Sequence, residues 1–157
     1  MHHSAPLWLP AAPFRSHVTH LMTASGLPWR AVALAASVPP ALVRSLLLGR
    51  DGRPRTKIHR VAATNLMSVT VDDLTALRSR VVSAQRLRRL IDRLHRHGFT
   101  TDEVGHQLRL TPEQVRAVTS GKATTSDAYT TLLARAACDA RCPNDREGAY
   151  LDTLMAA

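Results

Sequence analysis

The sequence predicts an all-α protein built from two similar helical units. Apolar residues recur at intervals of three and four along most of the chain, as they do in a helix that buries one face. No useful length of chain alternates between polar and apolar residues, so no strand is expected. Glycines and prolines divide the helical stretches, and several of them recur 72 positions later in the chain.

The first half of the chain is expected to hold an irregular arm and four helices. Residues 1–13 contain three prolines and form the expected arm. Gly26 and Gly49 are expected to end helices, and Pro40 suits a first turn because its missing N–H would have no partner there. The four helices are expected over residues 14–24, 28–36, 39–48 and 58–69, with a basic loop at 50–57.

The second half is expected to be helical as well. Asp72 and Asp73 suit the positive end of a new helix. Thr100 with Glu103, and Thr111 with Gln114, have the spacing of capping boxes. Further helices are expected over residues 87–97, 100–108, 111–120 and 128–140, and a terminal turn or helix over 149–155.

An offset of 72 residues aligns two segments of the chain without a gap. It places Gly26 on Gly98 and Gly49 on Gly121. Between these glycines it pairs Val32 with Val104, Pro40 with Pro112, Val43 with Val115 and Arg44 with Arg116. We therefore expect an internal repeat whose two copies are joined by an Arg-rich helical connection. The expected parts are the arm 1–13, a first unit 14–69, a second unit 70–141 and a C-terminal tail 142–157.

The inner helices of each unit fit a helix-turn-helix. That motif needs a small residue early in its first helix because the second helix crosses close above it, and Ala33 and Gly105 meet this need. The usual turn glycine is replaced by Ser37 and by Arg109. Since non-glycine residues seldom adopt a positive φ, one or both turns are expected to differ in geometry.

The net charge of the chain is +9, and it is unevenly distributed. Residues 1–70 carry eight Lys or Arg and one acid, which gives +7, whereas residues 71–157 carry thirteen and eleven, which gives +2. An arginine-rich chain also reflects a GC-rich genome, but that explanation predicts no such asymmetry. We expect a polyanionic partner that binds mainly the first half.

Several function classes are not expected. Two cysteines are too few for a disulfide-rich secreted domain, no apolar run is long enough to cross a bilayer, and the N-terminus does not fit a signal peptide. No catalytic constellation stands out, so neither an enzyme nor a cofactor is expected. His17 with His20 and Cys138 with Cys142 have helical spacings compatible with metal ligation, but without a complete ligand set no metal is expected.

Residues 21–49 resemble phage repressors of the Cro type and their bacterial relatives. Residues 15–135 as a whole are similar to a group of actinobacterial and actinophage proteins with two helix-turn-helix motifs separated by an Arg-rich loop and a helix. The matching segments are 46–49, 55–58, 62–69, 86–98 and 104–121. The resemblance implies a cytoplasmic, nucleoid-associated DNA-binding protein that regulates transcription.

A recognition helix presents its N-terminal half to base edges in the major groove. Arg44 and Arg116 are expected to contact guanine, and Glu113 to accept a hydrogen bond from cytosine. A solvated helix face is the alternative role for both arginines. The complete set of expected base contacts is Pro40, Ala41, Arg44, Ser45, Thr111, Glu113 and Arg116.

The basic loop offers contacts to the DNA backbone. Its Gly52-Arg53-Pro54 core is similar to an AT-hook, with Asp51 where that motif has another arginine. Minor-groove insertion, phosphate contact and a solvated connector all remain open for it. Expected phosphate or minor-groove contacts are Arg30, Arg50, Arg53, Arg55, Lys57, Arg60 and Lys122. Seven further arginines, expected to be scattered around their helices and mostly solvated, are Arg78, Arg80, Arg86, Arg88, Arg89, Arg93 and Arg96.

Two functions follow from these features. The first is a sequence-specific regulator, a repressor in the simplest form, that binds double-stranded DNA through both units. The second is an architectural or protein-interaction module in which only the first unit contacts DNA. In the second function, a partner protein or a second copy docks on the second unit and the C-terminal helices, where Asp102, Glu103 and Glu113 would repel phosphate.

Overall fold

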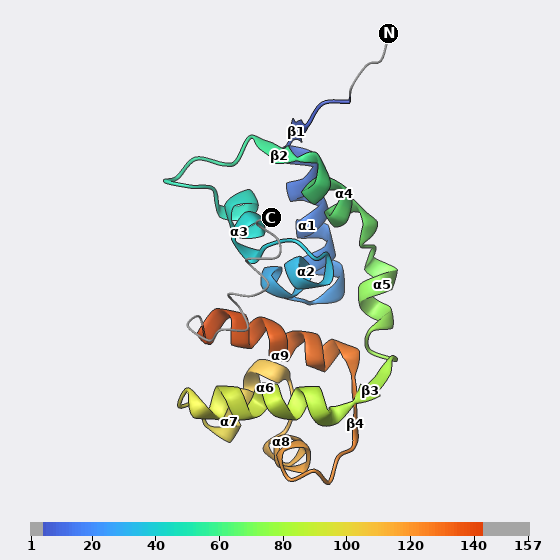
Figure 1. The fold of residues 1–157 in the computed structure, drawn as a ribbon, viewed down its shortest axis with the longest axis vertical. Coiled ribbons are helices and arrows are strands. Elements are labelled where there is room, and N and C mark those ends of the chain that lie inside the picture. The colour runs from blue at the N-terminus through green and yellow to red at the C-terminus, as the bar shows by residue number, and fades with distance from the viewer. Residues whose placement is uncertain (1–4, 143–157) are drawn as a thin grey trace. The chain divides into compact units, whose positions relative to one another are not determined.

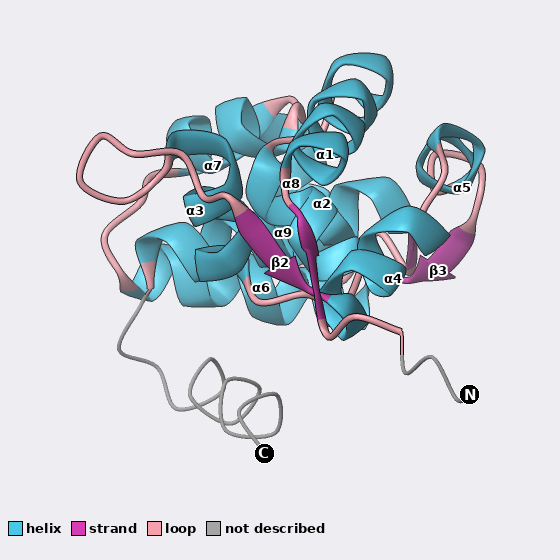
Figure 2. Cartoon of the chain, turned by 90° about the horizontal axis from the view of Figure 1, so that it is seen from above, coloured by secondary structure: helices cyan, strands magenta, loops and turns pink. Residues whose placement is uncertain are grey.

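The computed structural model describes residues 5–142 of the chain. The chain divides into two compact units, unit 1 at Met1–Leu74 and unit 2 at Thr75–Ala157 (Figure 1). Helices make up most of the described chain, and the strands among them are short (Figure 2). The expectation of a mainly helical protein is therefore confirmed.

Unit 1 consists of a strand, three helices, a second strand and a further helix. In chain order these are β1 (Trp8–Pro10), α1 (Ala12–Ser25), α2 (Trp29–Ala35), α3 (Pro40–Leu48), β2 (Lys57–His59) and α4 (Arg60–Ser68). Helices α1 to α4 enclose an aliphatic core, as expected of a chain with few aromatic residues. Its fully buried side chains include Val18, Leu21, Val32, Val43, Leu46, Ile58 and Leu66.

Unit 2 has the same order of elements. They are β3 (Val81–Ser83), α6 (Ala84–Arg96), α7 (Thr101–Leu108), α8 (Pro112–Thr119), β4 (Thr125–Asp127) and α9 (Ala128–Arg141). The core is again aliphatic and includes Leu87, Ile91, Leu94, Val104, Leu108 and Val115.

The strands correct the expectation of an all-α fold. β1 pairs antiparallel with β2, with Trp8 opposite His59, and β3 pairs antiparallel with β4, with Val81 opposite Asp127. Three-residue strands are too short for a period-two pattern, and their partners lie far along the chain. Part of the expected irregular arm 1–13 is thus β1 and the start of α1. Ile58, expected in a helix, is buried in β2 instead.

Local signals place most helix ends correctly. Gly26 has φ 71° and caps α1, as predicted. Both predicted capping boxes are confirmed: Thr100 with Glu103 begins α7, and Thr111 with Gln114 begins α8. Each box pairs N–H groups that the first helical turn leaves without a backbone acceptor.

Both tight turns adopt the left-handed conformation that the motif's usual glycine would supply, so the expectation that one or both depart from that geometry is wrong. Ser37 has φ 54° and Arg109 has φ 58°, both left-handed. After each of them an amide returns to the preceding helix: Val38 N–H donates to the Ala33 carbonyl at 3.0 Å, and Leu110 N–H donates to the Gly105 carbonyl at 2.8 Å. The Arg109 side chain also donates to Tyr129 Oη at 2.8 Å. These bonds hold non-glycine residues in a conformation that glycine usually supplies.

The segment between the units is acidic rather than arginine-rich. It is helix α5 (Val71–Ala76), with Asp72 and Asp73 in its first turn, and it crosses the boundary between the units. The arginine-rich helix, expected as a connection, is α6 inside unit 2. Of the expected tail 142–157, the structure describes only Cys142, so the turn or helix expected at 149–155 lies outside the described residues.

Replacing Gly105 with alanine should destabilise unit 2. A Cβ at this position would lie 2.7 Å from the Leu110 carbonyl oxygen, which the turn cannot move away. Overpacking of this kind costs about 1–3 kcal/mol, more than the gain of up to about 1 kcal/mol that alanine brings to an ordinary helix interior. Urea unfolding measures the difference, and an increase in stability would contradict the close approach.

Candidate nucleic-acid interface

Helix α3 turns one face inward and leaves another open to solvent. Val43 and Leu46 are buried, whereas Ala41, Arg44 and Leu48 are exposed, Leu48 with 67% of its surface accessible. The exposed residues follow a three-and-four spacing and form one strip along the helix. Arg44, expected to contact guanine, is the cation of that strip.

Two other expected base contacts on α3 are less accessible. Pro40 and Ser45 are both half-buried. The Ser45 hydroxyl donates to the Leu42 carbonyl at 2.8 Å and accepts from Arg55 Nη1 at 3.2 Å. Ser45 therefore joins α3 to the following loop, a role the sequence did not indicate.

The basic loop after α3 contains a tight turn at Arg50–Arg53. The Arg50 N–H donates to the Arg53 carbonyl at 2.9 Å, and the Arg53 N–H donates to the Arg50 carbonyl at 3.0 Å. Asp51 has φ 53° and Gly52 has φ 74°, the conformation that an Asp-Gly pair favours in a two-residue hairpin turn. Asp51 thus has a backbone role, and the segment differs from the flat Gly-Arg-Pro turn expected of an AT-hook. We call residues 50–53 the basic turn.

The foot of this loop is fixed to the helices. Arg15 on α1 donates from Nε to the Leu46 carbonyl and from Nη2 to the Arg55 carbonyl, both at 2.7 Å. Arg55 itself is half-buried and donates from Nε to the Lys57 carbonyl at 2.9 Å. Arg55, expected to contact phosphate, is therefore mainly a structural residue. Arg15 went unnoticed because a single arginine on an amphipathic helix carries no distinguishing pattern.

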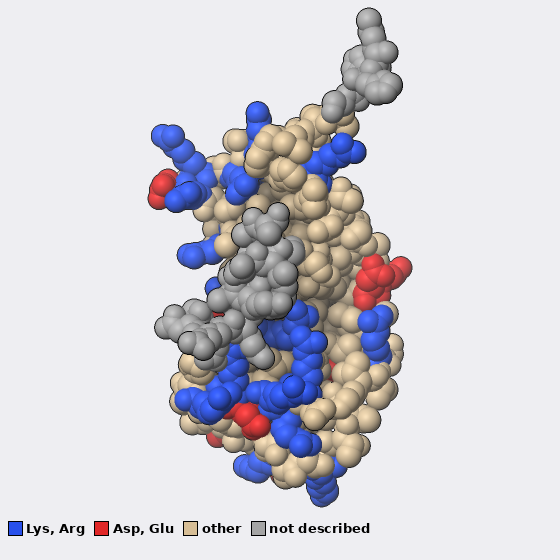
Figure 3. Space-filling view, in the orientation of Figure 1, with Lys and Arg blue, Asp and Glu red and all other residues tan. Residues whose placement is uncertain are grey.

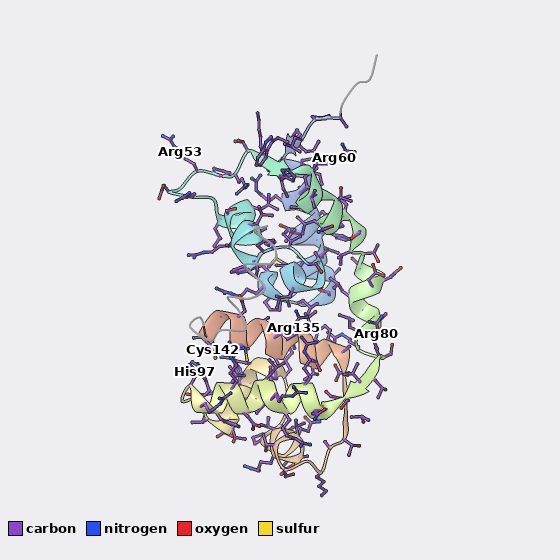
Figure 4. The ribbon with its side chains drawn as sticks, in the orientation of Figure 1. Arg53, Arg60, Arg80, His97, Arg135 and Cys142 are labelled. Carbon is purple, nitrogen blue, oxygen red and sulfur yellow. The ribbon has the colours of Figure 1, made fainter. Side chains whose placement is uncertain are left out.

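Arg50 and Arg53, the cations at the tip of the basic turn, are exposed, as expected of phosphate contacts. Figure 4 places Arg53 at the tip of the projecting loop and Arg60 at the start of α4, well apart. Lys57 and Arg60 are exposed, whereas Arg30 is half-buried with its guanidinium 4.3 Å from the centre of the Trp29 ring. The structure thus gathers only part of the expected cation set around α3.

Helix α8 in unit 2 carries the remaining expected contacts. Glu113 and Arg116 are exposed, and so is Lys122 beyond the helix end. Thr111 is exposed, and its Oγ1 accepts the Gln114 N–H at 3.2 Å as part of the capping box. An acid and a base therefore share the open face of α8, whereas the open strip of α3 has only a base.

The two units fix their third helix in the same way. Arg88 on α6 donates from Nε to the Val118 carbonyl at 3.0 Å, and Val118 lies 72 positions after Leu46, the acceptor of Arg15. The units differ in the segment that joins the third helix to the second strand. β2 begins 17 residues after Pro40, but β4 begins 13 residues after Pro112. Unit 2 is therefore four residues shorter where unit 1 has its basic turn.

Potential metal ligands in the described residues do not gather into a site. No group of three or more His, Cys, Asp or Glu side chains there could hold a metal ion. His17 Nε2 lies 3.0 Å from the carbonyl oxygens of both Leu66 and Val69 and thereby joins α1 to α4. Cys138 and Cys142 are buried, and Cys138 Sγ donates to the Leu90 carbonyl at 3.5 Å. Among the same residues, no helix is long and apolar enough to cross a membrane.

Comparison with protein families, with curated proteins and with solved structures found no match to this chain. The function therefore has to be argued from the residues of the chain itself. Those most relevant are the open strip of α3 and the anchored basic turn beside it.

Replacing Arg15 with methionine should loosen the basic turn and destabilise unit 1. The variant keeps the length of the side chain but loses both donors to the Leu46 and Arg55 carbonyls. The expected loss is about 1.5–3 kcal/mol, the range for a hydrogen bond from a charged group. Urea unfolding and amide hydrogen exchange at residues 50–57 measure both effects. Arg44→Met is the matched control, since Arg44 is exposed on α3, and an equal loss in both variants would rule out the anchoring role.

Proposed function

We propose that the chain is a sequence-specific regulator of transcription that binds double-stranded DNA. In this proposal α2 with α3, and α7 with α8, act as helix-turn-helix motifs, and α3 and α8 enter the major groove. Bound at a promoter, the chain would act as a repressor by excluding polymerase. Such a protein would be associated with the nucleoid in the cytoplasm.

One observation carries the proposal: the exposed strip of α3 adjoins the basic turn, whose loop is held to α1 and α3 at its foot. Arg44 on the strip supplies a donor for a base edge, while Arg50 and Arg53 supply positive charge for phosphates. Arg15 holds the loop to the end of α3 through two carbonyl groups. A fixed distance between base-reading and phosphate-binding groups sets the register of a protein on a duplex.

The exposed side chains of α3 favour recognition that depends partly on the shape of the DNA. With Ser45 engaged by Arg55, Arg44 supplies the polar contact, and Ala41 and Leu48 supply apolar surface for thymine methyl groups. Fewer polar contacts leave more of the specificity to the shape and deformability of DNA. The exposed cations of the basic turn would contact the backbone beside the groove.

We also propose that the two units arose by duplication. The shared order of elements, the matching left-handed turns and the equivalent arginine-to-carbonyl bonds of Arg15 and Arg88 support this. Unit 2 then retains the framework without the basic turn. Two units in one chain would bind two half-sites, as the two subunits of a dimer do.

A second candidate assigns unit 2 to protein contacts. Its favouring observation is the acidic character of α7 and α8, where Asp102, Glu103 and Glu113 are all exposed near the helix starts. These acids would repel phosphate, and unit 2 has no basic turn to offset them. In that function only unit 1 contacts DNA, and a partner protein or a second copy binds unit 2.

Selection of bound sequences from a random duplex pool tests the proposed function directly. The selected duplex and a scrambled one are then compared over a range of salt concentrations. A specific regulator binds the selected duplex at least about 1,000-fold more tightly. Equal affinity for both duplexes would refute sequence-specific regulation. One enriched half-site rather than two would favour the second candidate.

Arg44→Ala and Arg53→Ala should differ in their effects. The first should lower discrimination at one base pair by about 1–3 kcal/mol, because it removes a base contact. The second should weaken the selected and scrambled duplexes alike, and it should reduce the salt slope by about 1, because it removes a phosphate contact. Fluorescence anisotropy on matched duplexes measures both. Unchanged sequence preference in Arg44→Ala would exclude Arg44 as a base contact.

A further inference from the structure

Helix α6 presents a strip of arginines that the proposed function does not use. The expectation that these residues are scattered is wrong for four of them, because a helix advances about 100° per residue and they fall within about 80° of one another. We call them the α6 arginine strip. Its members are Arg86, Arg89, Arg93 and Arg96. Arg86, Arg89 and Arg96 are exposed, and Arg93 is half-buried with Nη2 3.3 Å from the Cys142 carbonyl.

Arg135 of α9 extends this positive surface. Helices α6 and α9 pack together, and in Figure 3 blue side chains gather where these two helices lie, with a smaller red patch among them. Arg135 is half-buried, and its pKa is lowered by burial and by the nearby charge of Arg86. Two neighbouring guanidinium groups repel each other, so a bound anion would stabilise this arrangement.

The α6 arginine strip adjoins the side of α6 that contacts α8. Around the helix, Arg88 lies about 160° from Arg86, about 100° from Arg89 and about 80° from Arg96. Arg88 is the residue that donates to the Val118 carbonyl of α8. The strip therefore extends around α6 away from the α8 contact, from Arg96 toward Arg86.

The form of the strip fits a nucleic-acid backbone better than a protein. It extends over ten residues, or about 15 Å, and one strand of a duplex places about four phosphates along that length. Arginine binds phosphate oxygens with two parallel N–H donors. The exposed neighbours Gln85 and Asp92 are polar, so the strip lacks the apolar anchor on which protein interfaces depend. Asp92 places one negative charge beside the four arginines, which leaves the surface positive.

We propose that the α6 arginine strip is a second, sequence-independent binding surface for the phosphate backbone of duplex DNA. One chain then holds two DNA segments, one on its base-reading helices and one on the strip. This inference goes beyond the proposed function and rests on it only for the identity of the polyanion.

The salt dependence of binding to a random-sequence duplex tests the strip. In Arg89→Ala the slope of log affinity against log salt should fall by about 0.9, the value for one phosphate contact. Arg80→Ala is the matched control, since Arg80 is exposed in unit 2 but lies before β3 and outside the strip (Figure 4). Equal slopes for Arg89→Ala and the unaltered chain would overturn the inference, which is also the result expected if the strip binds an acidic protein.

A capture experiment tests the second DNA segment. The full chain is bound to an immobilised duplex, and a labelled random duplex is then added. The unaltered chain and Arg80→Ala should retain the label, whereas the double variant Arg86→Ala with Arg89→Ala should lose it while still binding the immobilised duplex. Equal retention by the double variant, or none by the unaltered chain, would overturn the inference alone. A chain that binds no duplex at all would instead overturn the proposed function.

Discussion

The close contact between each tight turn and the helix before it is the constraint on which both units depend. At Gly105 an added Cβ would lie 2.7 Å from the Leu110 carbonyl, and the corresponding residue of unit 1 is the fully buried Ala33. Only a small side chain lets the amide after the turn reach back into that helix. The third helix then starts at a fixed angle, with Val43 or Val115 inward. The outward face that we assign to DNA is a consequence of this contact.

A second constraint, the hydrogen bonds of one arginine, distinguishes unit 1 from unit 2. Both third helices receive an arginine donor from the first helix, through Arg15 and Arg88. In unit 1 the same arginine also holds the Arg55 carbonyl, and so it supports a loop that is four residues longer than its counterpart. A common framework thus carries a cationic turn in one unit, whereas the other unit carries an arginine strip on its first helix. The two units thus share their order of elements and differ in where their positively charged side chains lie.

Much of the secondary structure was predictable because its signals are local. Capping boxes, helix-ending glycines and prolines in first turns act within a few residues, so Thr100, Thr111 and Gly26 were assigned correctly. The strands were missed because three residues hold too little pattern and each strand pairs with a distant partner. The turn geometry at Ser37 and Arg109 was misjudged, because residue preference disfavours a positive φ while hydrogen bonds to the rest of the unit impose it.

The sequence by itself determined the helical character of the chain, its core of aliphatic residues and the concentration of positive charge before residue 71. These properties depend on composition and short-range spacing. The tertiary structure decided which cations are exposed and which are structural. Arg15 and Arg55 donate to carbonyl groups, and Ser45 bonds to Arg55 of the loop. The four arginines of the α6 arginine strip share one side of a helix. Such roles depend on which backbone carbonyls come within reach of a side chain, and that is settled only when distant segments pack together.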